Sequence, residues 1–144
     1  MKKETFTLDQ EEHDIKEYHG FVYIVRDTKN MTSYIGEKSF WSKKRVEGKK
    51  NRITVESNWQ KYTTSSNYIK QQYKLRPDDF TFDILYLCSD KSVMKYMEHK
   101  LIISLGCLES DQWLNANARI TMLCKVKDLA TRITPVNVLQ IQGQ

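Results

Sequence analysis

Glu98 is a residue whose type and position could support chemistry, because it is a carboxylate that borders an apolar helical stripe. The apolar residues of the stripe recur at spacings of three, four and seven: Val93, Met94, Met97, Leu101, Ile102 and Leu105. Desolvating a carboxylate beside such a stripe costs free energy unless a cation compensates its charge. One interpretation is that Glu98 pairs with Lys95, one turn earlier, and reaches out to water. The other is that the compensating cation comes from elsewhere.

A zinc centre is not expected at this carboxylate or at any other position. The three histidines, His13, His19 and His99, form no HxxxH motif and have no cysteine at metal-ligand spacing. His13 and His19 lie in an acidic segment, and His99 would point away from Glu98 on the same helix. All three are therefore expected to be ordinary surface residues.

A dense run of cations lies in the first half of the chain. Residues 38–52 hold seven cations against Glu47 alone, a local charge of +6, whereas the whole chain carries +5. The cations are Lys38, Lys43, Lys44, Arg45, Lys49, Lys50 and Arg52. Such a run is either a solvated loop or a phosphate-binding surface, because like charges repel unless an anion lies across them. Phe40, Trp41 and Trp59 lie at its borders, and aromatic side chains beside cations favour nucleic acid through stacking and cation–π contact.

The composition is typical of one folded domain. The chain has 144 residues, 40% of them hydrophobic, which suits a single core and argues against intrinsic disorder. No window approaches 18 consecutive apolar residues, and the first residues lack an apolar leader, so neither a membrane span nor a signal peptide is expected. Cys88, Cys107 and Cys124 are odd in number and far apart, which indicates a reducing cytoplasm and excludes a CxxC zinc or redox motif.

The elements that position these residues begin with an arm and a hairpin. Residues 1–19 hold six acids against three lysines and are expected to form a polar arm or a loose first helix. The β-branched and aromatic runs at 21–25 and 33–36, separated by the turn-forming residues 27–30, predict an antiparallel hairpin. The basic stretch that follows is expected to be a long loop or a short helix.

Two helices and a third strand follow the basic stretch. Serines at 65–66 can cap a helix that Pro77 must end, since the residue before proline is pushed out of helical geometry. Residues 80–87 alternate and then become apolar, which predicts a strand. A cap at 89–90 starts the amphipathic helix that carries the stripe, and Gly106 ends it. The order β-β-α-β-α predicts an α+β fold with one sheet. A short extended piece is expected near Val136, Val138 and Ile141.

The hairpin carries two tyrosines that resemble the signature of the GIY-YIG nuclease family. Tyr34-Ile35-Gly36 matches the second half of that signature, and Tyr23 lies eleven residues before Tyr34, as in the family. The first half is degraded, with Phe21 in the place of its glycine. The family also places an arginine about ten residues after the second tyrosine, a glutamate on a late helix and an asparagine downstream. Lys44 with Arg45, Glu98 and Asn115 lie at these places, and residues 56–66 look like a segment of phage-encoded, homing-type members. The resemblance covers residues 20–120.

The resemblance implies a metal-dependent DNA endonuclease that hydrolyses phosphodiester bonds, on a three-stranded antiparallel sheet flanked by helices. Glu98 would hold Mg²⁺ or Mn²⁺, hard cations that need few protein ligands. Tyr23 and Tyr34 would position or deprotonate the attacking water, which requires a cationic neighbourhood because a phenol has a pKa of about 10. Lys44 or Arg45 would hold the scissile phosphate. The substrate-binding residues would be Gly36, through close approach of its backbone, Asn115, in a supporting hydrogen-bonding role, and Lys38, Lys43, Lys49, Lys50 and Arg52.

Two departures from the family pattern bear on turnover. The arginine position is Lys44, and an ammonium does not grip phosphate through two parallel hydrogen bonds as a guanidinium does. Thr64 stands where some relatives have a histidine. The alternatives are therefore a nucleic-acid-binding protein with weak or no cleavage, or a protein-binding inhibitor built on the same fold.

The resemblance also frames the organisation and partners of the chain. Residues 1–19 would form the acidic arm, 20–120 the nuclease domain with a basic insert at 38–57, and 121–144 a C-terminal extension. One active site per chain implies a homodimer or sequential nicking of the two strands. The expected setting is the cytoplasm of a bacterial host, with a bacteriophage as the source, DNA as the partner and no membrane. The acidic arm could mask the basic insert, in which case removing it would tighten DNA binding.

Overall fold

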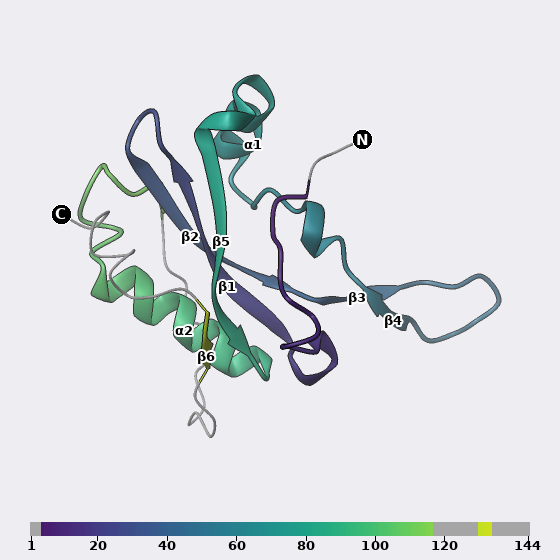
Figure 1. The fold of residues 1–144 in the computed structure, drawn as a ribbon. Coiled ribbons are helices and arrows are strands. Elements are labelled where there is room, and N and C mark those ends of the chain that lie inside the picture. The colour runs from purple at the N-terminus through teal and green to yellow at the C-terminus, as the bar shows by residue number, and fades with distance from the viewer. Residues whose placement is uncertain (1–3, 117–129, 134–144) are drawn as a thin grey trace.

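The computed structural model describes residues 4–116 and 130–133 of the chain. Its centre is an antiparallel sheet with the strand order β2-β1-β5-β6 (Figure 1). The strands are β1 Gly20–Asp27, β2 Thr32–Ser39, β5 Phe80–Cys88 and β6 Thr131–Arg132. The α+β class and the three main strands are confirmed. The two-residue β6 adds an edge to β5 and is too short to leave an alternating pattern in the sequence.

The β1–β2 hairpin places the two signature tyrosines on one face of the sheet. Its register pairs Tyr23 with Gly36 and Val25 with Tyr34. Cross-strand partners share a face, and residues two apart along a strand share a face. Tyr23, Gly36 and Tyr34 therefore lie on one side of the sheet, while Ile35 and Glu37 point to the other.

An ion pair ties the hairpin turn to the end of the first helix. The Asp27 carboxylate accepts hydrogen bonds from the backbone N–H groups of Lys29 and Asn30 within the turn. Arg76, just after α1 (Asn67–Leu75), grips the same carboxylate through Nη1–Oδ1 at 2.8 Å and Nη2–Oδ2 at 2.6 Å. The end of α1 before Pro77 is confirmed, and the chain then turns through the short 3₁₀ helix η3 (Pro77–Asp79) into β5.

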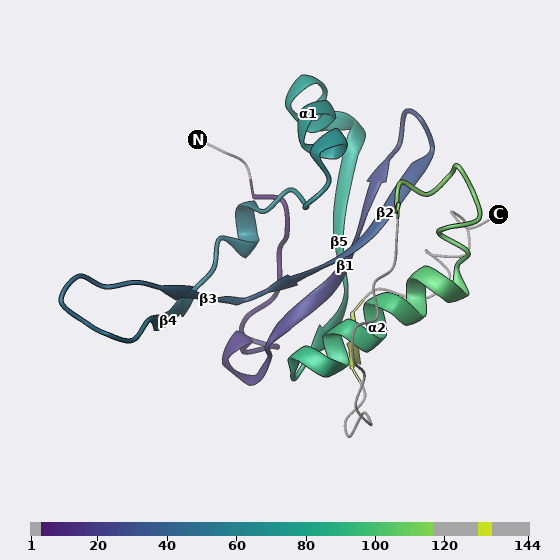
Figure 2. The same ribbon diagram turned by 180° about the vertical axis from the view of Figure 1, so that it is seen from behind.

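The second helix, α2 (Lys91–Ser104), covers the face of the sheet to which Ile35 and Glu37 point (Figure 2). Asp90 caps it, with Oδ1 accepting a hydrogen bond of 2.8 Å from the N–H of Val93. Gly106 follows the helix with φ +65°, a left-handed conformation that suits glycine. The predicted stripe is confirmed as the core face, since its residues pack with Val22, Ile24 and Leu85 of the sheet.

The opposite face of the sheet is covered by the N-terminal arm and the residues around α1. Phe6 is fully buried, with ring centroids 5.1 Å from Phe21 and 4.9 Å from Tyr23. The N–H of Thr5 donates to the carbonyl of Gln60 at 2.7 Å, beside the 3₁₀ helix η2 (Trp59–Lys61). The only helix among residues 4–19 is η1 (Ile15–Glu17), so the arm is mostly without regular secondary structure, and it contributes to the core.

The basic stretch forms neither a long loop nor a helix, contrary to prediction. It folds into a second hairpin of β3 (Trp41–Lys44) and β4 (Ile53–Glu56), which projects beyond the main sheet (Figure 1). Most residues of both strands are exposed. A ribbon with no buried face carries no alternation of apolar and polar residues, and for that reason the pattern did not reveal it.

The C-terminal extension and the question of a membrane span depend on which residues the structure describes. The extended piece near Val136, Val138 and Ile141 and most of the 121–144 extension fall among residues that the structure does not describe. Within 4–116 and 130–133, no helix is long and apolar enough to cross a membrane.

Candidate active site

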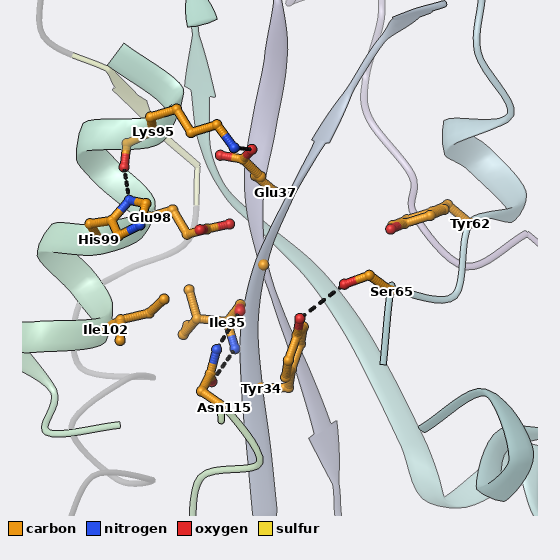
Figure 3. A pocket seen from close by; sticks show the side chains of 11 residues that line it. Tyr34, Ile35, Glu37, Tyr62, Ser65, Lys95, Glu98, His99, Ile102 and Asn115 are labelled. Atoms are coloured by element: carbon orange, nitrogen blue, oxygen red, sulfur yellow. Dashed lines mark hydrogen bonds and ion pairs between the residues drawn. The ribbon is translucent and has the colours of Figure 1, made fainter. Parts of the chain in front are cut away.

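A polar pocket of about 350 Å³ lies at the edge strand β2, where the second signature motif is found (Figure 3). It is lined by Tyr34, Ile35, Gly36, Glu37, Tyr62, Ser65, Lys95, Glu98, His99, Ile102 and Asn115. Figure 3 shows α2 on one side of β2 and the segment before α1 on the other. The pocket therefore wraps around the edge strand, and it brings Tyr34, Gly36, Glu98 and Asn115 of the predicted site together.

Glu98 is a carboxylate without a partner on the α2 side of the pocket. No hydrogen bond or ion pair joins it to another residue in the described part of the chain, and Figure 3 shows it pointing toward β2. Burial, and then the nearby negative charge of Glu37, raise the pKa of its carboxyl to about 7. Such a group is poised for a cation that would restore its ordinary acidity.

Glu37, which sequence reasoning missed, is the second carboxylate of the pocket. Its Oε1 is ion-paired with Lys95 Nζ, which raises the pKa of that lysine. Of the two interpretations of Glu98, the pairing with Lys95 is therefore wrong, since the lysine reaches across to the strand instead. Glu37 Oε2 is buried and has no hydrogen-bond partner among the residues described. Its position after Gly36 was a usable signal, because alternation points it toward α2.

The two tyrosines differ in their exposure to the pocket. Tyr34 lines it and shares a hydrogen bond of 3.0 Å between its hydroxyl and Ser65 Oγ. Tyr23 lies beneath, fully buried, with ring centroids 6.4 Å from Tyr34 and 6.2 Å from Tyr62. Burial, followed by the neighbouring Tyr62, raises the pKa of Tyr23 well above its ordinary value. The Tyr23 phenol thus keeps its proton near neutral pH.

Gly36 is required by Tyr23. A Cβ at position 36 would lie 2.3 Å from the Tyr23 hydroxyl and 2.4 Å from the ring carbon that bears it. The phenol therefore rests directly on the glycine backbone, and the third residue of the Tyr-Ile-Gly motif has a steric reason within this chain.

Asn115 and His99 hold the walls of the pocket in place. Asn115 Oδ1 accepts from the N–H of Ile35 at 3.0 Å, and its Nδ2 donates to the Ile35 carbonyl at 2.8 Å. The Asn115 amide thereby makes the two backbone hydrogen bonds to Ile35 that a neighbouring strand would otherwise make at this edge of the sheet. His99 was expected at the surface, but it is buried, and its Nδ1 lies 2.7 Å from the Lys95 carbonyl. Consecutive helical residues are only about 100° apart, so Glu98 and His99 both lie on the side of α2 that faces the pocket.

The expected phosphate-binding residues Lys44 and Arg45 do not line the pocket. Extended strand geometry, at about 3.3 Å per residue, carries them out along the projecting hairpin, where both are exposed. Lys38 lies closer, two residues after Gly36 on the same face of β2. Its Nζ is 4.5 Å from the ring centroid of Tyr62, and burial lowers its pKa.

The remaining cations and aromatics of the basic segment divide between surface and core. Lys43, Lys49, Lys50 and Arg52 are exposed on the hairpin. Phe40 and Trp59 are fully buried in the core, so the expectation that they stack on nucleic acid is wrong. Their rings pack on each other and on Phe21 instead, with centroid distances of 5.1–6.0 Å.

The donor set of the pocket fits a hard divalent cation held by few ligands. Nowhere in residues 4–116 and 130–133 do three His, Cys, Asp or Glu side chains converge as a metal cluster. Glu98 and the free oxygen of Glu37 are carboxylate oxygens without partners in a half-buried setting. Mg²⁺ and Mn²⁺ suit such sites, because they retain several waters and need one or two carboxylates.

Other pocket residues beyond the predicted set are Tyr62, Ser65, Lys95 and His99. Tyr62 and Ser65 belong to the segment 56–66 that resembled phage-encoded nucleases, so that likeness was the available signal. Lys95 and His99 could be placed only once the orientation of α2 against β2 was known.

Comparison with known proteins accords with this geometry. A family model described as "Putative endonuclease segE, GIY-YIG domain" matches residues 2–118, most of the chain and all of the pocket. No curated protein and no solved structure matches the chain. The match includes the N-terminal arm as well as both tyrosines, Glu98 and Asn115. The chain belongs to the GIY-YIG endonuclease family, in its segE-type branch.

Proposed function

We propose that this protein is a metal-dependent endonuclease that hydrolyses phosphodiester bonds of DNA. The observation that carries the proposal is the pocket at β2, where the Tyr34 hydroxyl and the partnerless Glu98 carboxylate face one space from opposite sides of the strand. Family membership supports nuclease activity in general, and the pocket supports the particular groups assigned below.

Glu98 is assigned to hold Mg²⁺ or Mn²⁺, with Glu37 beside it. When bound, such an ion neutralises charge on the phosphate and assists departure of the 3′ oxygen. The pocket residues support a cation there, because two carboxylates face it and Lys95 pairs with only one of them, Glu37.

Tyr34 is assigned to orient the attacking water and, as a phenolate, to accept its proton, with Ser65 fixing the direction of the side chain. The water oxygen forms a bond to phosphorus, the bond from phosphorus to the 3′ oxygen breaks, and the departing 3′ oxygen takes a proton from solvent. Tyr23 is assigned as a hydrogen-bond donor rather than as a base, since its raised pKa keeps the phenol protonated.

Lys38 is the cation that we assign to the phosphate in place of Lys44 and Arg45. It lies on the Tyr34 face of β2, and it has no carboxylate partner in the described ion pairs. A half-buried ammonium without an anion gains most from a phosphate placed beside it. The exposed cations of the β3–β4 hairpin are assigned to the flanking DNA backbone, where they would make affinity salt-dependent.

The test is nicking of supercoiled plasmid by the full chain with Mg²⁺, with Mn²⁺ and with EDTA. We expect metal-dependent nicking that leaves 5′-phosphate and 3′-hydroxyl ends. Tyr34→Phe should nick about 10²-fold more slowly or worse, the range for loss of a general base. A wild-type protein that binds DNA but nicks no substrate with either metal would contradict the proposal.

A second candidate function, DNA binding without efficient cleavage, is favoured by one observation. Lys44 and Arg45, at the place of the family arginine, are exposed on the hairpin and do not line the pocket. The same plasmid assay decides between the two functions, because a binding protein would retain salt-dependent DNA affinity while leaving the plasmid supercoiled.

A further inference from the structure

A second hollow, here called the hairpin cleft, lies between the β3–β4 hairpin and the first turn of α2. It encloses about 550 Å³ and is lined by residues from four parts of the chain. Trp41 and Lys43 come from the hairpin, Lys91 from α2, His19 from the segment before β1, and Glu37 and Lys38 from β2. Glu37 also lines the active pocket, so the two hollows meet at β2.

Positive charge dominates the cleft. Lys38, Lys43 and Lys91 converge on it, and none of them forms an ion pair with a described residue. Asp90 is engaged in capping α2 through Val93, and one oxygen of Glu37 pairs with Lys95. Glu37 is therefore the one carboxylate among the residues that line the cleft, and the three lysines outnumber it.

The walls of the cleft are held in place before any ligand arrives. The Trp41 indole Nε1 donates to the Tyr18 carbonyl at 2.9 Å, and Lys43 Nζ donates to Thr54 Oγ1 at 2.7 Å. His19 is fixed at its backbone, where its N–H donates to the Cys88 carbonyl at 2.8 Å. Groups that are already positioned lose little entropy when they bind an anion.

We propose that the hairpin cleft binds a second phosphodiester of the nucleic-acid strand, next to the one in the active pocket, through Lys43, Lys91 and the His19 ring. The proposal rests on the proposed function for the identity of the anion. The cleft would not take part in catalysis. It would fix the position of the nucleic-acid strand, so that the scissile phosphate falls beside Gly36.

The test uses the dinucleotide dTpdT, which carries one phosphodiester, and the full ¹⁵N-labelled chain in EDTA. We expect saturable changes in the ¹H–¹⁵N signals of the Trp41 indole and of the Lys91 backbone. The double variant Lys43→Gln/Lys91→Gln should bind at least about tenfold more weakly, because each charge-assisted hydrogen bond contributes a factor of that order. Lys70→Gln/Lys74→Gln on α1 removes the same charge far from the cleft and should change affinity less than about twofold.

Duplex DNA provides a second measurement. The slope of log affinity against log salt should fall by about 1 for each cleft lysine removed. Signal changes confined to the Tyr34–Glu98 pocket or to the hairpin loop, or equal losses in the two double variants, would overturn the proposal. Changes in the cleft without any plasmid nicking would support the cleft and contradict the proposed nuclease function, so the two failures are distinguishable.

Discussion

Tyr23, Gly36 and Glu98 show how single residues set the chemistry of this site. Gly36 has no side chain, which lets the buried Tyr23 phenol lie directly on the edge strand. Burial raises the pKa of Tyr23 and so keeps the phenol protonated. Glu98 sits across the strand with its pKa raised to about 7 by burial and by Glu37. Each of these features can be tested by one substitution.

Gly36→Ala should destabilise the fold by about 1–3 kcal/mol, the usual cost of overpacking. The added Cβ would lie 2.3 Å from the Tyr23 hydroxyl, so the ring or the strand must shift. Urea unfolding measures the loss. In a Tyr23→Ala background the same substitution should cost almost nothing, and an unchanged cost there would show that Tyr23 is not the obstacle.

Without metal, Glu98 should destabilise the fold as pH rises. Its folded pKa of about 7 lies above the unfolded value near 4.3, so the favourable neutral form is present at low pH and is lost as pH rises through 7. Relative to Glu98→Gln, the wild type should lose about 1–3 kcal/mol between pH 5 and pH 8, measured by urea unfolding in EDTA.

Added Mg²⁺ supplies the control for this pH effect. It should stabilise the wild type more at pH 8 than at pH 5, because only the ionised carboxylate binds the ion, and it should not stabilise Glu98→Gln. Parallel pH profiles for the two proteins would contradict the buried, partnerless carboxylate described above.

At the scale of elements, the pair of Asp27 and Arg76 joins the β1–β2 turn to the end of α1. Asp27→Ala should cost about 1–3 kcal/mol, since it leaves two turn amides without their acceptor and Arg76 with Asp79 as its remaining carboxylate. Hydrogen bonds from Arg76 hold the pKa of Asp27 below its usual range. The stabilisation is therefore present above about pH 4 and is lost as pH falls through the lowered pKa.

Acid unfolding of the wild type and of Asp27→Asn measures this contribution. The difference in unfolding free energy between the two proteins should shrink as pH falls below 4. A difference that stays constant to pH 2 would show that the carboxylate charge is not what ties the turn to α1.

Elements with one buried face were predictable from the sequence, and elements without one were not. The stripe of α2 and the alternation of β5 encode burial directly, so their positions and caps followed from the residues. The exposed β3–β4 ribbon leaves no such pattern. Because its strand geometry was missed, Lys44 and Arg45 were wrongly expected beside the tyrosines. Glu37 and Lys95 meet only through packing of α2 against β2, which no local pattern records.

At the scale of the whole molecule, charge is separated between the acidic arm and the basic hairpin. The arm cannot simply be deleted to test whether it masks the hairpin, because Phe6 and Ile15 are part of the core. Substituting the exposed acids Glu11, Glu12 and Glu17 with glutamine leaves these contacts intact.

This triple variant should bind duplex DNA more tightly, with a larger gain at low salt, because added net positive charge acts through screened attraction. Fluorescence anisotropy across a salt series measures the gain. Thermal unfolding should be unchanged within about 0.5 kcal/mol, the usual limit for surface substitutions. Equal affinity at every salt concentration would show that the arm does not oppose DNA binding.

The central claim is that the β2 pocket hydrolyses phosphodiesters with a cation held by Glu98. Its most direct test compares plasmid nicking by the wild type, by Glu98→Gln and by Glu109→Gln, a matched change at an exposed glutamate outside the pocket. We predict metal-dependent nicking by the wild type and Glu109→Gln, and a loss of at least about 10³-fold in Glu98→Gln, as for removal of a main electrostatic contributor. Equal nicking by Glu98→Gln and the wild type would contradict the account.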